Sequence, residues 1–238
     1  VPKFTWLNLL VAVWIAGSVI YISRVMIKYY KAVKALKANV IDGTPEMQAK
    51  LDLISQKCGI RRKVKLKTTD CVISPVTYGF FNHVILIPNR EFDDRDFGYI
   101  ATHECCHIKN KDIWIKLLTE IYCGIFWWNP FAHLLKKDLT YCLELRCDKR
   151  VTSKLSENRC TVYYEVLVTQ MKAYKEQQES EESDRETALK SALVGMSFVT
   201  NEKGKKIVSR MEMILYPKKK QTIINNIVTA LMALLIVG

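Results

Sequence analysis

An uncharged, apolar run near the start of the chain constrains its fold more than any other feature. The run FTWLNLLVAVWIAGSVIYIS occupies residues 4–23. As a helix, about 20 apolar residues cross the hydrocarbon core of a bilayer. A second apolar run, TIINNIVTALMALLIVG, occupies residues 222–238. We therefore expect transmembrane helices at residues 1–23 and 222–238, the second one truncated. A buried core helix is the alternative for each run.

The distribution of positive charge predicts how these spans are oriented. Lys and Arg outnumber Asp and Glu by 36 to 24, which gives a formal net charge of +12. Basic residues follow the first run and precede the second: Arg24, Lys28, Lys31, Lys34, Lys37, Lys218, Lys219 and Lys220. Because basic residues beside membrane spans mark the cytoplasmic side, residues 24–221 are expected in the cytosol of a multi-pass membrane protein. The basic excess then reflects topology, and direct binding of nucleic acid is not expected.

Between the two runs the pattern alternates short strands with helices. Apolar and basic residues alternate in KVKLKTTD, which indicates a strand, and SPVTYGFFNHVILIP reads as a strand pair. Helical spacing covers residues 46–58, 93–111, 136–154 and 161–178. The eight cysteines include no CxxC pair and are expected to be free thiols in a reducing cytosol. The fold class predicted from this order is α+β.

A very apolar segment at residues 113–135 interrupts this pattern. Lys116 and Glu120 make it a poor membrane span, and Asn129-Pro130 breaks it in two. Two tryptophans, Trp127 and Trp128, precede the break. We expect a pair of membrane-apposed helices here. A buried core helix is the alternative.

The stretch ATHECCHIKNKD carries the pattern HExxH. On a helix His103 and His107 lie one turn apart on one face, so both imidazoles can bind one ion. Glu104 is close enough to hydrogen-bond a water at that ion and to act as its general base. A catalytic zinc has three protein ligands, so one more ligand must come from elsewhere in the chain.

The candidate third ligand lies in CLELRCDKR. Glu144 and Asp148 are again four residues apart on one helical face. Glu144 would complete a His2Glu zinc site, and Asp148 could accept a hydrogen bond from a ligating histidine and orient it. His133 is the competing third ligand, although it stands alone in the apolar segment.

The strand HVILIP, residues 83–88, directly precedes the HExxH helix. If this strand forms an exposed sheet edge beside the ion, an extended peptide substrate can pair with it. An ordinary buried strand is the alternative.

Several of these pieces together resemble a known family. THECCHIKNKD, WWNP and ELRCD, preceded by SPVTYGFFNHVILIP, look like the membrane zinc metallopeptidases of the BlaR/MecR antirepressor family, which sense and transduce a beta-lactam signal. The resemblance covers about residues 60–220. It implies a membrane-anchored, gluzincin-like domain in which a small sheet packs on the HExxH helix. It also implies His103, His107 and Glu144 as Zn2+ ligands and Glu104 as the base.

The resemblance also implies substrates and partners. Family members relay an antibiotic signal that ends in loss of a BlaI/MecI-like repressor from DNA. Some cut themselves between Ser and Phe, and Ser197-Phe198 stands in a similar setting here. No penicillin-binding sensor is present in this sequence, so beta-lactam sensing is one option among several. A homodimer remains open.

Three other functions compete with this interpretation. One is a membrane quality-control zinc protease of the ExxxAD class, although that class usually has more spans and lacks WWNP. Another is a non-catalytic, zinc-stabilised signalling scaffold, which would not need the glutamate of HExxH. The last is a basic nucleic-acid-binding module, which the absence of an aromatic and basic patch away from the membrane flanks disfavours.

Overall fold

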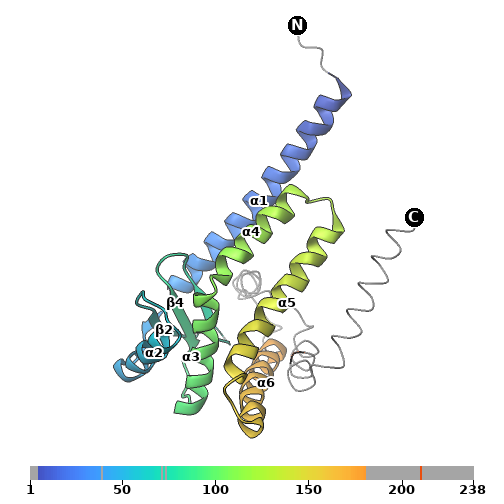
Figure 1. The fold of residues 1–238 in the computed structure, drawn as a ribbon. Coiled ribbons are helices and arrows are strands. Elements are labelled where there is room, and N and C mark those ends of the chain that lie inside the picture. Colours follow the sequence, from blue (N-terminus) through green and yellow to red (C-terminus); the bar gives the residue numbers. More distant parts are fainter. Residues whose placement is uncertain (1–4, 39, 71, 73, 181–209, 211–238) are drawn as a thin grey trace, which may run out of the picture. The chain divides into compact units, whose positions relative to one another are not determined.

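The computed structural model describes residues 5–38, 40–70, 72, 74–180 and 210 (Figure 1). The expected span at 222–238 and the expected cleavage position Ser197-Phe198 lie outside this part of the chain. The elements in chain order are α1 (Trp6–Ala38), β1 (Ile41–Asp42), α2 (Pro45–Lys57), β2 (Lys65–Thr69), β3 (Val76–Tyr78), β4 (Val84–Pro88), α3 (Asp94–Lys109), α4 (Asp112–Ile125), α5 (Pro130–Thr152) and α6 (Glu157–Ser180).

Helix α1 contains the first apolar run from Trp6 onward and extends beyond the end of that run. It has 33 residues, and within the described residues it is the one helix long and apolar enough to cross a membrane. None of its most apolar window is buried against the rest of the protein. At 1.5 Å per residue the helix is about 50 Å long, so its basic second half projects beyond a ~30 Å hydrocarbon core. The helix therefore joins an apolar segment to a cationic one without a break.

The sheet has four strands in the order β1-β2-β4-β3. Strands β2 and β4 are parallel, whereas β1 and β3 pair antiparallel with their neighbours. Strand β4 is thus an interior strand, so the exposed sheet edge considered for HVILIP is wrong and its alternative, an ordinary buried strand, is confirmed. The physical reason is its unbroken apolar run, which is typical of a strand covered on both faces. The outer strand on that side is β3.

Both faces of β4 are covered by helices. Ile85 and Ile87 pack with Leu51 of α2 and with Phe97 and Cys105 of α3. On the opposite face Val84 and Leu86 pack with Tyr78 of β3, Val72 and Leu36 near the end of α1. The sheet is therefore held between α2 and α3 on one side and the basic end of α1 on the other. This packing ties the HExxH helix to a rigid base.

A two-residue corner joins α3 to α4. Asn110 ends α3, and Lys111 takes a left-handed conformation with φ of 56°, which is uncommon for a residue other than glycine. Helix α4 then begins at Asp112 and runs beside α1 (Figure 1). The corner therefore connects the HExxH helix directly to the helix that packs on the membrane-length segment.

Helix α5 is longer than expected. The sequence predicts a separate helix at 136–154, but α5 runs unbroken from Pro130 to Thr152. Asn129 starts it, because its side chain accepts a hydrogen bond of 2.9 Å from the backbone N–H of Phe131. No glycine or proline follows within the helix, so nothing stops it at the end of the apolar segment. The second half of α5 packs against α3, and α6 packs against both.

Two glycines let α1 lie close to α4 and to the turn that follows it. A Cβ atom on Gly17 would lie 2.3 Å from the Trp127 ring, and one on Gly124 would lie 2.5 Å from Ile22. By contrast, a Cβ on Gly98 of α3 would meet nothing within 4 Å. Small residues at such positions are typical of helices that pack in a membrane.

These glycines give a paired stability test. We expect Gly17→Ala to lower the melting temperature in detergent micelles, because the added methyl displaces the Trp127 ring. Gly98→Ala should raise it by about 2–4 °C, since alanine favours the helix by up to ~1 kcal/mol. Intrinsic fluorescence during heating measures both. If Gly17→Ala raised the melting temperature as much as Gly98→Ala does, the close packing of α1 on the turn at Trp127 would be contradicted.

Candidate metal centre

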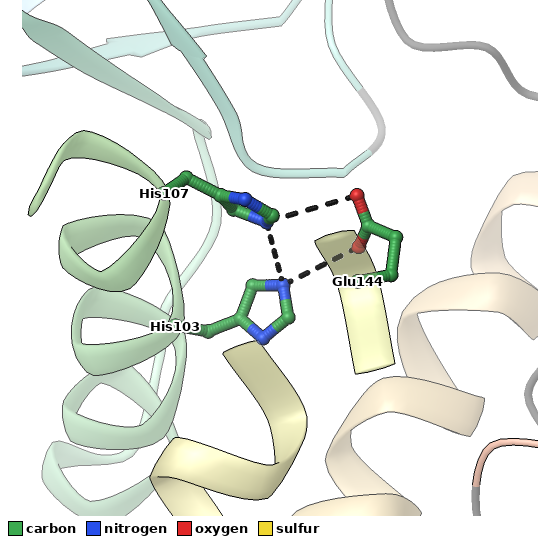
Figure 2. Close-up of side chains that lie close together, drawn as sticks. All are labelled: His103, His107 and Glu144. Carbon is green, nitrogen blue, oxygen red and sulfur yellow. Dashed lines mark hydrogen bonds and ion pairs between the residues drawn. The ribbon is translucent and has the colours of Figure 1, made fainter. Parts of the chain in front are cut away.

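Helix α3 brings the two histidines of HExxH face to face. The Nε2 atoms of His103 and His107 lie 3.1 Å apart, as the i and i+4 spacing predicts (Figure 2). His103 is buried and His107 is nearly so. The two rings therefore offer two nitrogen atoms to one point between α3 and α5.

Glu144 of α5 faces that point from the other side. Its carboxylate oxygens lie 3.5 Å from Nε2 of His103 and 3.7 Å from Nε2 of His107 (Figure 2). Burial by itself raises the pKa of this carboxyl, but the charge of His107, hydrogen bonds from both histidines and Lys116 outweigh it. They hold the pKa of Glu144 well below its usual value. The residue is therefore a carboxylate at neutral pH, as a metal ligand must be.

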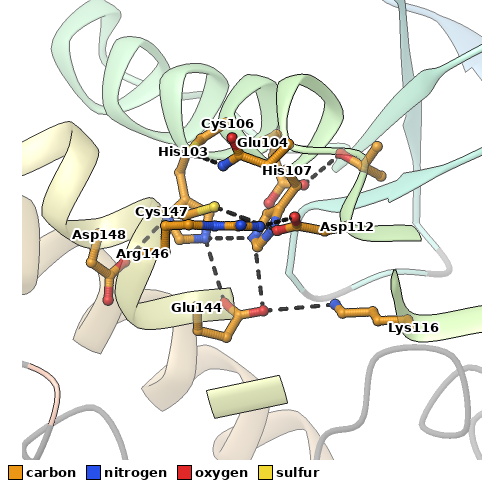
Figure 3. A network of polar contacts seen from close by, with 12 residues as sticks. His103, Glu104, Cys106, His107, Asp112, Lys116, Glu144, Arg146, Cys147 and Asp148 are labelled. Atoms are coloured by element: carbon orange, nitrogen blue, oxygen red, sulfur yellow. Dashed lines mark hydrogen bonds and ion pairs between the residues drawn. The ribbon is translucent and has the colours of Figure 1, made fainter. Parts of the chain in front are cut away.

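The opposite nitrogens of both rings face other carboxylates (Figure 3). Nδ1 of His107 lies 2.7 Å from Asp112, and Nδ1 of His103 lies 3.2 Å from Asp148. Tyr163 of α6 donates a 2.7 Å hydrogen bond to the same Asp148 oxygen. Burial lowers the pKa of each histidine, but the surrounding carboxylates raise it above the ordinary value. The pocket therefore attracts positive charge.

This geometry fits a metal ion. In a metal site each ring would carry its proton on Nδ1, facing Asp148 or Asp112, and turn the lone pair of Nε2 toward the ion. The two Nε2 atoms, 3.1 Å apart, and the Glu144 carboxylate would then face the same ion. In a tetrahedral zinc site with bonds of about 2.0–2.2 Å, neighbouring ligand atoms are about 3.3 Å apart. The ligand atoms of His103, His107 and Glu144 lie within 4.8 Å of one another, as this requires.

Asp112 forms the centre of a second cluster. It is almost fully buried, accepts from His107 and pairs with the guanidinium of Arg146. The Cys147 thiol lies 3.3 Å from Nδ1 of His107. His107, Asp112 and Cys147 also have the donor types of a metal site, but here His107 and Arg146 already hold both Asp112 oxygens. The cluster orients His107.

Glu104, the expected base, points toward the sheet. Its carboxylate accepts a 2.5 Å hydrogen bond from the hydroxyl of Thr77. Thr77 lies on the outer strand β3, so the edge of the sheet and the expected base are in direct contact. The adjacent Cys105 and Cys106 are buried, and the seven cysteines within the described residues are free thiols. The thiol of Cys105 faces Cys58 and that of Cys106 faces Cys147, so they fill the helix contacts around the site.

The structure thus brings together four residues named from the sequence and separates a fifth. His103, His107, Glu144 and Asp148 meet between α3 and α5. His133, the competing ligand, lies at the start of α5, where its Nε2 is 3.2 Å from the Trp127 carbonyl. Sequence reasoning missed Asp112, Tyr163 and Thr77. A signal existed only for Asp112, which ends the motif THECCHIKNKD.

Asp112 should control the metal affinity through His107. We expect Asp112→Asn to weaken zinc retention by about 10–100-fold, the usual loss when an outer hydrogen-bond partner of a ligating histidine is changed. Titration with a competing zinc chelator measures this affinity. The exposed Asp138→Asn on α5 is the matched control and should bind zinc as the unaltered chain does. Equal affinity of Asp112→Asn and the control would show that Asp112 does not orient His107.

A HExxH helix, a carboxylate from a second helix and a helix of membrane-spanning length are the features expected of a membrane metallopeptidase. The family model described as BlaR1 peptidase M56 matches residues 1–194. The chain therefore belongs to the BlaR1 peptidase M56 family, as its motifs indicated.

Curated relatives agree with this family. The chain is 26% identical over 174 residues to the Regulatory protein BlaR1 of Staphylococcus aureus, which covers 71% of this chain and 30% of that protein. It is 25% identical over 159 residues to the Regulatory protein BlaR1 of Bacillus licheniformis, covering 66% and 26%. The Methicillin resistance mecR1 protein of Staphylococcus aureus (strain Mu50 / ATCC 700699) is 22% identical over 164 residues, covering 67% and 28%. The chain spans less than a third of the length of these relatives.

Proposed function

We propose that this protein is a membrane-bound zinc endopeptidase with a gluzincin-like catalytic domain that transduces an external signal. The observation that carries the proposal is the pair of Nε2 atoms 3.1 Å apart, faced by the Glu144 carboxylate at 3.5 and 3.7 Å. His103, His107 and Glu144 would hold the ion. A zinc ion bound there would act as a Lewis acid toward water and the scissile carbonyl.

The residues around the ligands have distinct tasks in this proposal. Glu104 takes a proton from the attacking water and delivers it to the leaving amine. The Thr77 hydroxyl, 2.5 Å away, keeps the Glu104 carboxylate at the sheet edge. Asp148 and Asp112 fix the two imidazole rings through Nδ1. Proton transfer and ligand orientation are thus divided among different side chains.

The outer strand β3 supplies a binding edge for a peptide. It pairs with β4 on one side, and no strand within the described residues pairs with its other side. An extended peptide could add to this edge through backbone hydrogen bonds. Because Thr77 of β3 contacts Glu104, a peptide bound there would have its backbone close to the base. This edge replaces the one expected at HVILIP.

The location follows from α1 and the basic residues beside it. We propose that α1 spans the membrane, that residues 24–221 form the cytosolic catalytic domain and that residues 222–238 form a further span. The substrates proposed are a BlaI/MecI-like repressor and the chain itself at Ser197-Phe198. The names of the relatives, a regulatory protein and a methicillin resistance protein, support a role in relaying a signal.

Metal removal tests the proposal. The chain is expressed in bacterial membranes together with a BlaI/MecI-like repressor, and we expect one zinc per chain and cleavage of the repressor, of the chain or of both. A chelator should remove the metal and stop cleavage, and added zinc should restore it. Mass spectrometry of the fragments locates the cleaved bond. Cleavage that persists in metal-free protein contradicts a zinc peptidase, and bound zinc without any cleavage would favour the scaffold.

A further inference from the structure

The far ends of α4 and α5 expose an unusual number of large apolar side chains. Phe131 is 74% exposed, Leu118 63% and Trp128 62%. The other exposed apolar side chains of these two helix ends and their turn are Ile121, Tyr122, Ile125, Trp127, Leu134 and Leu135. We call this surface the hairpin tip. A soluble surface rarely carries so large an apolar patch, so the patch requires an apolar neighbour.

The hairpin tip lies beside the apolar half of α1. The indole N–H of Trp14 donates a 2.8 Å hydrogen bond to the Ile125 carbonyl, and the indole N–H of Trp127 donates to the Trp14 carbonyl at 3.3 Å. The exposed apolar side chains of α1 around Trp14 therefore continue directly into the tip. Whatever covers this part of α1 also covers the tip.

The charged side chain beside the tip is paired within the protein. Between Lys116 and Lys136 the sequence has one charged residue, Glu120. Glu120 pairs with Lys136 at 2.6 Å and accepts a hydrogen bond from Tyr21 of α1 at 3.3 Å. In a hydrocarbon environment a charge must be paired in this way.

The turn between the helices also makes hydrogen bonds within the protein. The backbone N–H groups of Phe126, Asn129 and Ala132 donate to carbonyls at 2.9–3.2 Å, and that of Phe131 is capped by the Asn129 side chain. The carbonyls of Ile125 and Trp127 face the Trp14 indole and the His133 ring. Non-helical backbone at membrane depth is tolerated only when it is satisfied by the protein.

The position of the hairpin tip along α1 gives the depth of the tip in the bilayer. Trp14 stands ten residues before Arg24, the first basic residue after the apolar run, which corresponds to about 15 Å along a helix. This is half of the ~30 Å hydrocarbon core. Helix α4, with 14 residues, is about 21 Å long and too short to cross.

We infer that α4 and α5 form a re-entrant hairpin that enters the lipid bilayer from the catalytic side and turns back near the midplane. The occupant of the apolar patch is the acyl interior of the membrane. The hairpin goes beyond the membrane-apposed helices expected from the sequence, because its tip reaches the depth of Trp14. The inference rests on the membrane location of α1 in the proposed function and not on peptidase activity.

Photolabelling in lipid vesicles tests the depth. The full chain is reconstituted in phosphatidylglycerol and phosphatidylcholine vesicles that carry a diazirine either at the end of the acyl chain or in the headgroup. We expect the chain-end probe to label Trp128 and Phe131 at yields matching Val11 and Ile15 of α1. Leu53 of α2, apolar and 59% exposed, is the control and should stay unlabelled. Peptide mass spectrometry reads out the sites.

Each other outcome overturns the inference. Labelling of the tip by the headgroup probe alone would mean that the hairpin lies on the membrane surface. An unlabelled tip beside a labelled α1 would mean that protein, such as a second copy of the chain, covers the patch. If α1 is also unlabelled, the membrane location in the proposed function fails too. Loss of peptidase activity leaves all these readouts unchanged.

Discussion

Replacing Glu104 by glutamine is expected to stop peptide cleavage while leaving the metal in place. Glutamine has the shape of glutamate, and its amide oxygen can still accept the hydrogen bond that the Thr77 hydroxyl donates. The amide cannot take up a proton, however. Since a positioned general base contributes about 10²–10⁴-fold to the rate, cleavage should fall by that factor. Glu104 contributes no ligand atom to the cluster of His103, His107 and Glu144, so the zinc content should not change.

Two measurements on the same membrane preparation decide this prediction. Fragment yield over time gives the cleavage rate, and elemental analysis gives the zinc per chain. Glu91→Gln, an exposed glutamate in the loop before α3, is the matched control and should cleave at the unaltered rate. If Glu104→Gln cleaves as fast as this control, Glu104 is not the base.

Replacing Glu144 by alanine is expected to have the opposite pattern, with the metal lost first and cleavage lost as a consequence. The two histidines remain, but no carboxylate would contact the ion directly. Loss of a direct ligand should lower the zinc affinity by more than the roughly 10–100-fold expected when an outer hydrogen-bond partner is changed. We therefore expect a larger fall in zinc affinity than for Asp112→Asn.

Competition with a zinc chelator measures this affinity at fixed pH. Glu165→Ala, an exposed glutamate on α6, controls for the loss of one negative charge and should keep the metal. Zinc content of Glu144→Ala equal to that of the control would contradict the proposed ligand set. His133 could not then replace Glu144 without a rearrangement, because it stands at the opposite end of α5, against the Trp127 carbonyl.

The helical parts of the site could be predicted from local sequence. Spacing of four residues places His103 with His107, and Glu144 with Asp148, on single helical faces whatever the rest of the fold does. The contact between α3 and α5, in contrast, is a matter of tertiary structure. It depends on the packing of α3 on the sheet and on the return of α5 along α3, which no local pattern encodes. The need of a catalytic zinc for a third protein ligand, and then the resemblance to a family, linked the two motifs in advance.

The missed residues show the limits of such reasoning. Asp112 reaches His107 because Lys111 adopts a left-handed conformation, and a lysine gives no sign of that. Tyr163 lies 60 residues from His103 in the sequence. Both residues contact the Asp148 carboxylate only because α6 packs beside the site. The edge position of β3 depends on β4 entering the sheet between it and β2. The apolar run VILIP did carry a signal for an interior strand, since both of its faces are buried.

The two-residue corner at Asn110 and Lys111 couples the orientation of α4 to that of α3. The corner joins the two helices directly, and Asp112, the first residue of α4, contacts His107. A tilt of about 10° at this corner moves the distant end of a helix about 21 Å long by roughly 4 Å. Conversely, if α1 displaced the far end of α4 by that distance, Asp112 would rotate relative to the His107 imidazole. Helix α4 thus connects α1 directly to the candidate metal centre.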